Sequence, residues 1–243
     1  MSYPFTQIVP YYDNPEMFRE QQRVWRGLHA KQRASLHVIV VDDGSPEYPA
    51  SKQIEPETVT ALASFRLFRT KVDVRWNWLF CRNLGAEKAQ TEWLLMTDMD
   101  HVIPGTTWAV LMKQKLDPLN AYRLTRVDMP ELTPVDPHPN TWVMTRHMFR
   151  ERVGGYDESF SGIYGSDGEF QGRVNLWART VVMLDAPAIR YNPDAIADAS
   201  TTRYERKTVE DRERKRAIRE SIRKLGNDHK PKRLTFPWMQ VYP

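Results

Sequence analysis

Two apolar runs that each end in paired acidic residues constrain this chain more than any other feature. The runs and their acids are Trp93–Thr97 with Asp98 and Asp100, and Leu36–Val41 with Asp42 and Asp43. Continuous apolar runs of this length are typical of strands buried on both faces of a sheet. We therefore expect an α/β fold in which helices cover both sides of a mostly parallel sheet.

The order of the first elements predicts that the acidic ends lie together. A strand over Phe5–Val9 and a loop over Pro10–Asn14 precede a helix from Pro15 to about Ala30, where Asn14 can cap and Pro15 suits the first turn. A strand, helix, strand order with short links forms a right-handed parallel unit. Ligands bind beyond the carboxyl ends of such strands, so the acids are expected to share a ligand site.

The two acidic pairs suit different chemistry. In extended chain, Asp98 and Asp100 point the same way and can share one cation. Asp42 and Asp43 can accept hydrogen bonds from a ribose hydroxyl or a base N–H, with Gly44 permitting the turn. The structural alternatives are a helix-capping loop for the first pair and a plain turn for the second.

Composition sets further limits. The 243 residues suit one α/β domain with appendages, and the sequence has no apolar run near twenty residues and no signal-peptide pattern. Cytoplasmic location is the expectation. The single cysteine, Cys81, excludes an internal disulfide and is expected to be a small buried residue rather than a nucleophile.

The basic charge is concentrated near the C-terminus. The net charge is +4, and residues 203–233 contain 13 Lys or Arg against 6 Asp or Glu. A charged helix is expected from Thr202 to Leu225. It is either a solvated helix or a surface for an anionic partner, such as nucleic acid, an anionic membrane or a donor diphosphate. The aromatic stretch Phe236–Met239 is expected to anchor the chain end on the fold.

The middle of the chain is predicted to alternate helices, strands and one proline-rich loop. The expected elements are a helix over Thr106–Lys115, strands over Ala121–Val127 and Thr141–Thr145, a short helix from Arg146, and a helix through Val174–Trp177. Four prolines between Pro130 and Asn140 predict a loop at the surface or over the site. His138 in this loop is expected to be solvated rather than a metal ligand.

Four segments, taken in order, carry a resemblance. They are IVPYYDNPEMF, VIVVDDGS, CRNLGAEKAQTEWLLMTDMDHVIP and GGYDESFSGIYGSDGEF. Together they resemble a family 2 type glycosyltransferase of the GT-A fold, with a catalytic end similar to galactosyltransferase and chondroitin-polymerase relatives. The resemblance covers roughly residues 4–190. It implies a GT-A domain over 1–202, with a donor-binding half at about 1–105 and an acceptor and catalytic half at about 106–202. A basic helical extension would occupy 203–243.

The resemblance also implies the residues of a donor site for a nucleoside diphosphate sugar, with UDP as the carrier. Pro10 and Tyr11 would lie beside the base, and Asp42 and Asp43 would bind uracil or ribose. Arg82 of the R-N-x-G pattern would contact the diphosphate or sugar, the alternative being a surface arginine at a helix start. Asp98 would contact ribose and metal, and Asp100 would bind the metal. Mn²⁺ or Mg²⁺ held by carboxylates neutralises charge on a departing diphosphate.

The second half of the resemblance implies the catalytic end. Asp167 matches the family's general base, and Tyr164, Ser166 and Glu169 are the candidate acceptor contacts, Glu169 being either a site acid or a helix cap. Ser166 stands where the family has a glutamate, which departs from a standard sugar acceptor.

A second departure concerns the metal. The histidine that many members supply as a further ligand is absent between Gly168 and Arg203. Asn192, Asp194, water or His101 would take its place, although His101, as an alternate residue, is expected to face away from the acids.

The resemblance thus implies a metal-dependent, inverting glycosyltransferase acting on a glycan or another hydroxyl compound. The alternatives are a retaining transferase of the same fold, a transferase that modifies a nucleic-acid base through the basic helix, and an inactive nucleic-acid-binding relative. A nucleotidyltransferase would need a Gly-rich basic loop near the first strand, and VPYYDNPEMF contains none.

Overall fold

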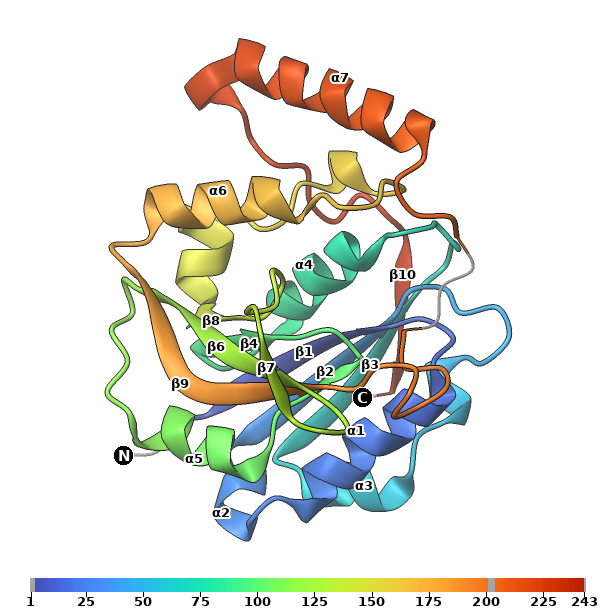
Figure 1. The fold of residues 1–243 in the computed structure, drawn as a ribbon, viewed down its shortest axis with the longest axis vertical. Helices are drawn as coiled ribbons and strands as arrows, with labels where there is room; N and C mark the ends of the chain where they lie inside the picture. Colours follow the sequence, from blue (N-terminus) through green and yellow to red (C-terminus); the bar gives the residue numbers. More distant parts are fainter. Residues whose placement is uncertain (1–2, 201–203, 243) are drawn as a thin grey trace.

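A computed structural model describes residues 3–200 and 204–242 and shows one large sheet between two layers of helices (Figure 1). The strands are β1 (Phe5–Tyr11), β2 (Leu36–Asp42), β3 (Ser64–Thr70), β4 (Trp93–Met96), β5 (His101–Val102), β6 (Ala121–Asp128), β7 (Thr133–Val135), β8 (Trp142–Thr145), β9 (Val181–Arg190) and β10 (Trp238–Tyr242). The α-helices are α1 (Pro15–Gly27), α2 (Ala30–Arg33), α3 (Pro56–Ala61), α4 (Trp78–Lys88), α5 (Gly105–Lys113), α6 (Asp167–Trp177) and α7 (Val209–Leu225).

The sheet has the parallel centre that the sequence predicts. Its order is β10-β3-β2-β1-β4-β8-β6-β9-β5, with β7 paired to β6. Strands β3, β2, β1 and β4 are mutually parallel, while β8 and β10 run antiparallel to their neighbours β4 and β3. Because β1, β2 and β4 point the same way, their carboxyl ends lie at one edge of the sheet, and the expected grouping of the acidic strand ends is confirmed.

Both faces of the sheet are covered, as the apolar runs require. Helices α1, α2, α3 and α5 cover one face, and α4 and α6 cover the other, with α7 outermost (Figure 1). Each face has its own cluster of buried apolar side chains. Strand residues alternate between the two clusters, as in Val40 and Val41 of β2.

Helix α4 packs unusually close to the centre of the sheet. A Cβ atom on Gly85 would lie 2.3 Å from Ile8 Cγ2 of β1, so only glycine allows this approach. Cys81 in the same helix is fully buried among apolar side chains, as expected. The close contact fixes the rotation of α4 and turns Arg82 inward.

Several element ends differ from the sequence expectation. Strand β1 continues through Pro10 and Tyr11, which were expected in a loop. The first helix ends at Gly27, a residue of low helix propensity, and a separate short helix begins at Ala30. Within the expected loop 130–140, residues 133–135 pair with β6 as β7.

The charged helix starts later than expected. Residues 201–203 lie outside the described residues, residues 204–208 are not helical, and Thr208 caps α7 by accepting a hydrogen bond from the Asp211 N–H at 3.1 Å. The end of the chain returns to the sheet as expected, because β10 pairs with β3 and Trp238 packs edge-on against Phe68. No helix in the described ranges is long and apolar enough to cross a membrane.

Candidate functional site

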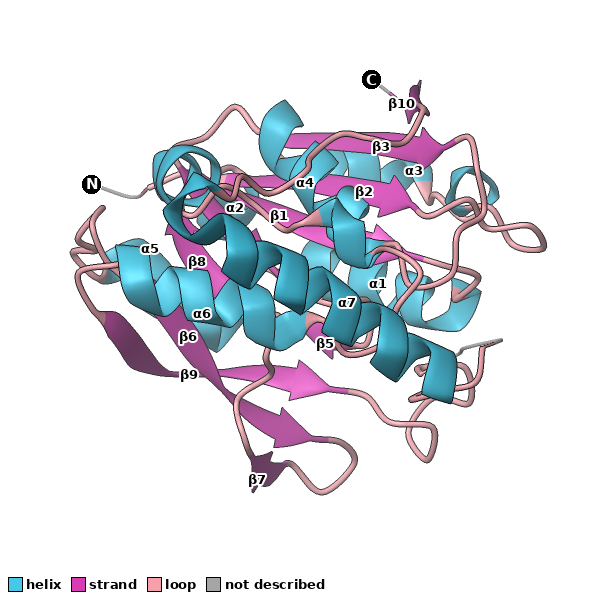
Figure 2. Cartoon of the chain, turned by 90° about the horizontal axis from the view of Figure 1, so that it is seen from above, coloured by secondary structure: helices cyan, strands magenta, loops and turns pink. Residues whose placement is uncertain are grey.

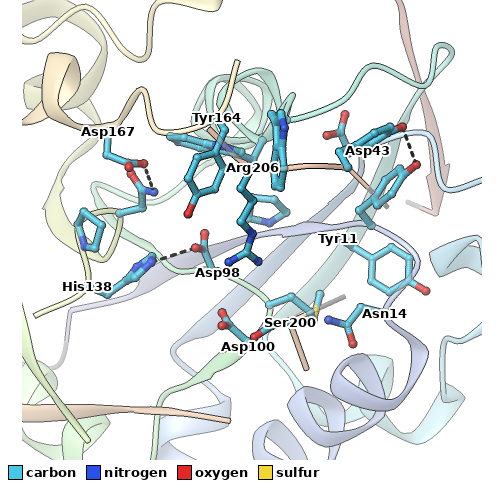
Figure 3. A pocket seen from close by; sticks show the side chains of 18 of the residues that line it. Tyr11, Asn14, Asp43, Asp98, Asp100, His138, Tyr164, Asp167, Ser200 and Arg206 are labelled. Atoms are coloured by element: carbon cyan, nitrogen blue, oxygen red, sulfur yellow. Dashed lines mark hydrogen bonds and ion pairs between the residues drawn. The ribbon is translucent and has the colours of Figure 1, made fainter. Parts of the chain in front are cut away.

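A cavity of about 390 Å³ opens at the edge of the sheet where β1, β2 and β4 end (Figure 3). Seven of the predicted site residues line it: Pro10, Tyr11, Asp43, Asp98, Asp100, Tyr164 and Asp167. The other four predicted residues lie outside the lining: Asp42, Arg82, Ser166 and Glu169. The structure therefore gathers acids from three separate segments around one space, at the position where open α/β sheets bind ligands.

Asp42 and Asp43 have different roles, although they are adjacent. The Asp42 carboxylate is buried and accepts hydrogen bonds from the Ser45 N–H at 2.8 Å and the Ala50 N–H at 2.9 Å, so it holds the turn after β2. Asp43 lines the cavity, and its Oδ1 atom is buried without a hydrogen-bond partner among the described residues. Gly44 lets the chain turn here, with φ +78° and no room for a Cβ beside Val72 O. Asp43 alone is therefore available to a ligand.

Arg82 is neither a surface residue nor part of the cavity lining. Its side chain is 0% exposed, its guanidinium pairs with the Asp98 carboxylate, and it lies 4.5 Å from the Trp78 ring centroid. The surface-arginine alternative is therefore wrong, because α4 packs with Arg82 facing the sheet. Burial alone would raise the pKa of Asp98, but Arg82, followed by His138, holds the pKa of this carboxyl well below its usual range. Arg82 thus keeps Asp98 ionised from behind the cavity wall.

His138 lies at the site, contrary to the sequence expectation of a solvated side chain. Its side chain is 13% exposed, and its Nε2 atom is 3.1 Å from Asp98 Oδ2. The ring lies 4.2 Å from the His101 ring, and burial lowers the pKa of His138 despite the nearby carboxylate. The cause is the proline-rich loop, which folds over the cavity and adds His138, Pro139 and Asn140 to its wall.

The second acid of the pair is held by its neighbour. Asp100 Oδ1 is 2.7 Å from His101 Nδ1, so His101 contacts the acids instead of facing away. The His101 ring is buried, and its Nε2 atom has no hydrogen-bond partner within the described residues. Neither Asn192 nor Asp194 lines the cavity: Asn192 accepts hydrogen bonds from the N–H groups of Asp194 and Ala195 within a turn.

The acidic pair fits a divalent cation that is bound partly by substrate. Within residues 3–200 and 204–242, no three His, Cys, Asp or Glu side chains are grouped to hold a metal ion. Mg²⁺-like ions, however, are usually held by one or two carboxylates together with substrate phosphates and water. Asp98 and Asp100 line the same cavity and supply hard oxygen ligands. The residues therefore fit a metal that binds together with an anionic ligand.

Asp167, the predicted catalytic residue, lines the same cavity (Figure 3). It begins α6, and its Oδ1 accepts a hydrogen bond from Asn140 Nδ2 at 2.6 Å. Ser166 next to it is buried and is not part of the cavity lining. Glu169 pairs with Arg173 at 2.6 Å and makes no side-chain cap, so it is neither a cavity acid nor a helix cap.

Besides His138, three of the cavity residues that the sequence did not indicate make contacts at the site. Trp76 follows β3, and its ring centroid is 5.0 Å from that of Tyr164. Asn140 holds Asp167, and Arg206 projects into the cavity from the C-terminal segment, 5.5 Å from the Tyr164 ring (Figure 3). No sequence pattern indicated Trp76, whereas Asn140 ends the proline-rich loop that was expected at the surface or over the site. Arg206 belongs to the basic region already singled out, but nothing in that region distinguishes it from its neighbours.

Asp43 should reduce the stability of the fold at neutral and higher pH. Burial raises the pKa of its carboxyl well above the usual value, so wild-type stability should fall as the pH rises from about 4 toward the raised pKa. Asp43→Asn removes the ionisable group and should raise Tm by about 2–4 °C at pH 8, the shift that ~1 kcal/mol produces at this size. Thermal melts at pH 4 and pH 8 test this, because the difference should disappear at pH 4. A variant that melts below wild type at pH 8 would show that the ionised carboxylate is stabilising.

No protein-family model matches the chain, and no curated protein matches it by sequence. Among solved structures, TarS residues 1–349 of S. aureus in complex with UDP-GlcNAc is similar with a TM-score of 0.68 and 15% identity, over 93% of this chain and 68% of that chain. The match to the same TarS fragment in another crystal structure spans 63% of the length of that fragment.

Two further structures share the fold. The mannosyltransferase PcManGT from Pyrobaculum calidifontis, in complex with GDP-Man and Mn²⁺, has a TM-score of 0.56 and 18% identity, over 78% of this chain and 57% of that chain. GalNAc-T7 with UDP, GalNAc and Mn²⁺ has a TM-score of 0.59 and 11% identity, over 79% of this chain and 44% of that chain. This chain thus spans less than two thirds of both. The expected α/β GT-A fold is confirmed.

Proposed function

We propose that this protein is a glycosyltransferase that moves a sugar from a nucleoside diphosphate sugar to an acceptor hydroxyl. One observation carries the proposal: Asp43, the Asp98–Asp100 pair and Asp167 line a single cavity at the carboxyl ends of the parallel strands. The fold supports it, because the similar TarS, PcManGT and GalNAc-T7 structures hold UDP-GlcNAc, GDP-Man and UDP. The proposal includes the finer assignment: a family 2 type enzyme with a catalytic end similar to galactosyltransferase and chondroitin-polymerase relatives.

The donor nucleotide would bind along the ends of β1 and β2. Pro10 and Tyr11 form the cavity wall there, and the Asp43 carboxylate, which lines the same cavity, can accept a hydrogen bond from a ribose hydroxyl or a base N–H. UDP is the proposed carrier.

The diphosphate would lie between Asp43 and Asp167, next to the acidic pair. Asp98 and Asp100 would hold Mn²⁺ or Mg²⁺, which when bound supplies positive charge to the departing diphosphate. Arg82 and His138 keep Asp98 in place, each through one of its two carboxylate oxygens. Arg206 adds a guanidinium on the same cavity wall as Tyr164, where it can bind a phosphate oxygen directly.

Asp167 is proposed as the general base of an inverting transfer. Its carboxylate would take the proton of the acceptor hydroxyl as the hydroxyl oxygen bonds to the anomeric carbon and the bond to the diphosphate breaks. Inversion requires the acceptor and the leaving group on opposite faces of that carbon. Asp167 on α6 and Asp98 after β4 border the cavity from different elements, and Asn140 fixes the Asp167 carboxylate by donating to it. Tyr164 beside Asp167 is the proposed acceptor contact.

Binding of nucleotide sugars tests the proposal most directly. Titration calorimetry with UDP- and GDP-sugars, each with Mn²⁺, with Mg²⁺ and with EDTA, should show binding that EDTA weakens. Asp100→Asn should remove the metal dependence while keeping the fold, since its side chain is only partly buried. If no nucleotide sugar binds in the presence of either metal, the proposal fails.

Arg206 should contribute to donor affinity. Arg206→Gln should weaken binding of the nucleotide sugar by about 10–150-fold, because a hydrogen bond to a charged group is worth about 1.5–3 kcal/mol. Its side chain is exposed and makes no ion pair among the described residues, so Tm should stay unchanged. Lys207→Gln removes the neighbouring charge and is the matched control in calorimetry. Equal affinity in the two variants would place Arg206 outside the donor site.

A further inference from the structure

Helix α7 carries its positive charge on one flank. Arg212, Arg216, Arg219 and Arg223 follow one another at intervals of four, three and four residues, which puts them within roughly 60° of each other around the helix. All four are exposed, and together with Lys215 they line a shallow groove that one carboxylate, Glu220, borders. The helix is therefore not an evenly mixed charged surface.

The arginines of this stripe are available to a partner. The ion pairs of residues 3–200 and 204–242 include α7 only through Glu210 and Asp211, which both contact Arg75. Arg212 donates to Lys207 O, and Arg216, Arg219 and Arg223 have no hydrogen bond or ion pair within the described chain. A solvated helix gains stability from Glu–Arg pairs at i, i+4, and the stripe makes none of them.

The stripe begins next to the candidate active site. Lys215, between the stripe and the packed face of α7, donates to the carbonyl oxygens of Tyr164 and Gly165, both at 2.9 Å. Tyr164 and Gly165 line the cavity immediately before Asp167. Helix α7 lies outermost on this side of the molecule, further from the sheet than α6 (Figures 1 and 2). A ligand lying along the stripe would thus pass the acceptor side of the cavity.

We propose that this stripe binds the phosphate backbone of a nucleic-acid duplex. A membrane surface fits poorly, because an interfacial helix must insert an apolar face, and the Ile218 and Ile222 side chains of α7 pack against the core instead. A single strand fits poorly too, because such strands stack bases on aromatic side chains, and α7 has no aromatic residue. Backbone recognition of a duplex needs only positive charge at regular spacing.

The length of the stripe suits this partner. From Arg212 to Arg223 the helix rises about 16 Å, and about ten phosphates of the two strands lie over the same length of a duplex axis. The four guanidiniums, on long flexible side chains, can therefore each reach a phosphate of one strand or the other. The duplex would carry the acceptor hydroxyl, and this last step alone rests on the proposed glycosyl transfer.

The salt dependence of binding tests the proposal without any sugar donor. Fluorescence anisotropy with a labelled 20-base-pair DNA duplex should give a slope of log K against log[salt] of about −3.6 for four contacts, or about a 150-fold loss from 50 to 200 mM salt. The triple variant R216Q/R219Q/R223Q should retain a slope near −0.9 and lose only about 3.5-fold. The control K31Q/K52Q/K113Q removes the same charge from exposed lysines elsewhere and should behave like wild type.

Three results would overturn the proposal. The first is a triple variant that keeps the wild-type slope while the control does the same. The second is tighter binding to the single strand than to the duplex. The third is equal binding to vesicles that contain anionic phosphatidylserine. Because the donor is absent from every arm, failure of the glycosyltransferase proposal would leave these outcomes unchanged.

Discussion

Asp167→Asn should slow sugar transfer by about 10²–10⁴-fold and leave donor affinity within about twofold, because a general base contributes a factor of this size. The asparagine keeps the shape of the side chain and an oxygen that can accept from Asn140 Nδ2, which is 2.6 Å from Asp167 Oδ1 in the wild type. It cannot take up the proton of an acceptor hydroxyl. The variant thus isolates proton transfer from positioning.

The measurement needs both rate and affinity. Single-turnover assays with excess enzyme report the transfer step, and calorimetry reports donor binding separately. Asp185→Asn on β9 is the matched control, since Asp185 is exposed and outside the cavity lining, and it should transfer at the wild-type rate. If Asp167→Asn loses donor affinity together with transfer, Asp167 contacts the donor, and the retaining mechanism becomes the better proposal.

The donor half of the site was predictable because strand patterns report position directly. A buried strand must end where its apolar run ends, and parallel strands bring those ends to one edge. Asp43, Asp98 and Asp100 therefore reached the cavity as the sequence indicated. The sequence could not show which of Asp42 and Asp43 lines the cavity, because that depends on how the turn at Gly44 orients the two side chains.

The remaining misses arise where tertiary packing decides the outcome. Arg82 has the pattern of a surface or ligand-binding arginine, but the contact of Gly85 with Ile8 rotates it inward onto Asp98. His138 lies in a loop whose prolines predict irregular structure without predicting where the loop folds. Arg206 lies 5.5 Å from the Tyr164 ring, and the following helix α7 is held to the Tyr164 and Gly165 carbonyls through Lys215. No local pattern contains these long-range contacts.

Glu158 also makes long-range contacts that no local sequence pattern reveals, and these contacts concern stability. It belongs to the GGYDE motif that resembles a catalytic segment, yet it is 4% exposed and holds the C-terminal segment in place. Its carboxylate accepts hydrogen bonds from Asn83 Nδ2 at 2.8 Å, the Leu234 N–H at 2.8 Å and the Thr235 N–H at 2.7 Å. Helix α4 and the chain leading to β10 are thereby joined through one buried charge.

Glu158→Ala should therefore lower the free energy of unfolding by about 3 kcal/mol, because it removes several charge-assisted hydrogen bonds at once. Glu158→Gln keeps an accepting oxygen without the charge and should lose about half as much. Urea unfolding followed by circular dichroism measures both, and a smaller m-value in the alanine variant would show that the C-terminal segment has already detached.

Glu151→Ala is the control for these variants, because the Glu151 side chain is 56% exposed and its nearest cation, the Arg150 side chain, is 3.9 Å away. It should change the free energy of unfolding by less than about 0.5 kcal/mol. The loss in the free energy of unfolding should therefore be largest for Glu158→Ala, smaller for Glu158→Gln and smallest for Glu151→Ala, because the three variants remove progressively less of the hydrogen bonding to a buried charge. If Glu158→Gln were as destabilising as Glu158→Ala, the negative charge alone would hold the segment. If both matched the control, the C-terminal segment would be held by its apolar contacts, Phe236 with Phe80 and Trp238 with Phe68, and the buried carboxylate would contribute no net stability.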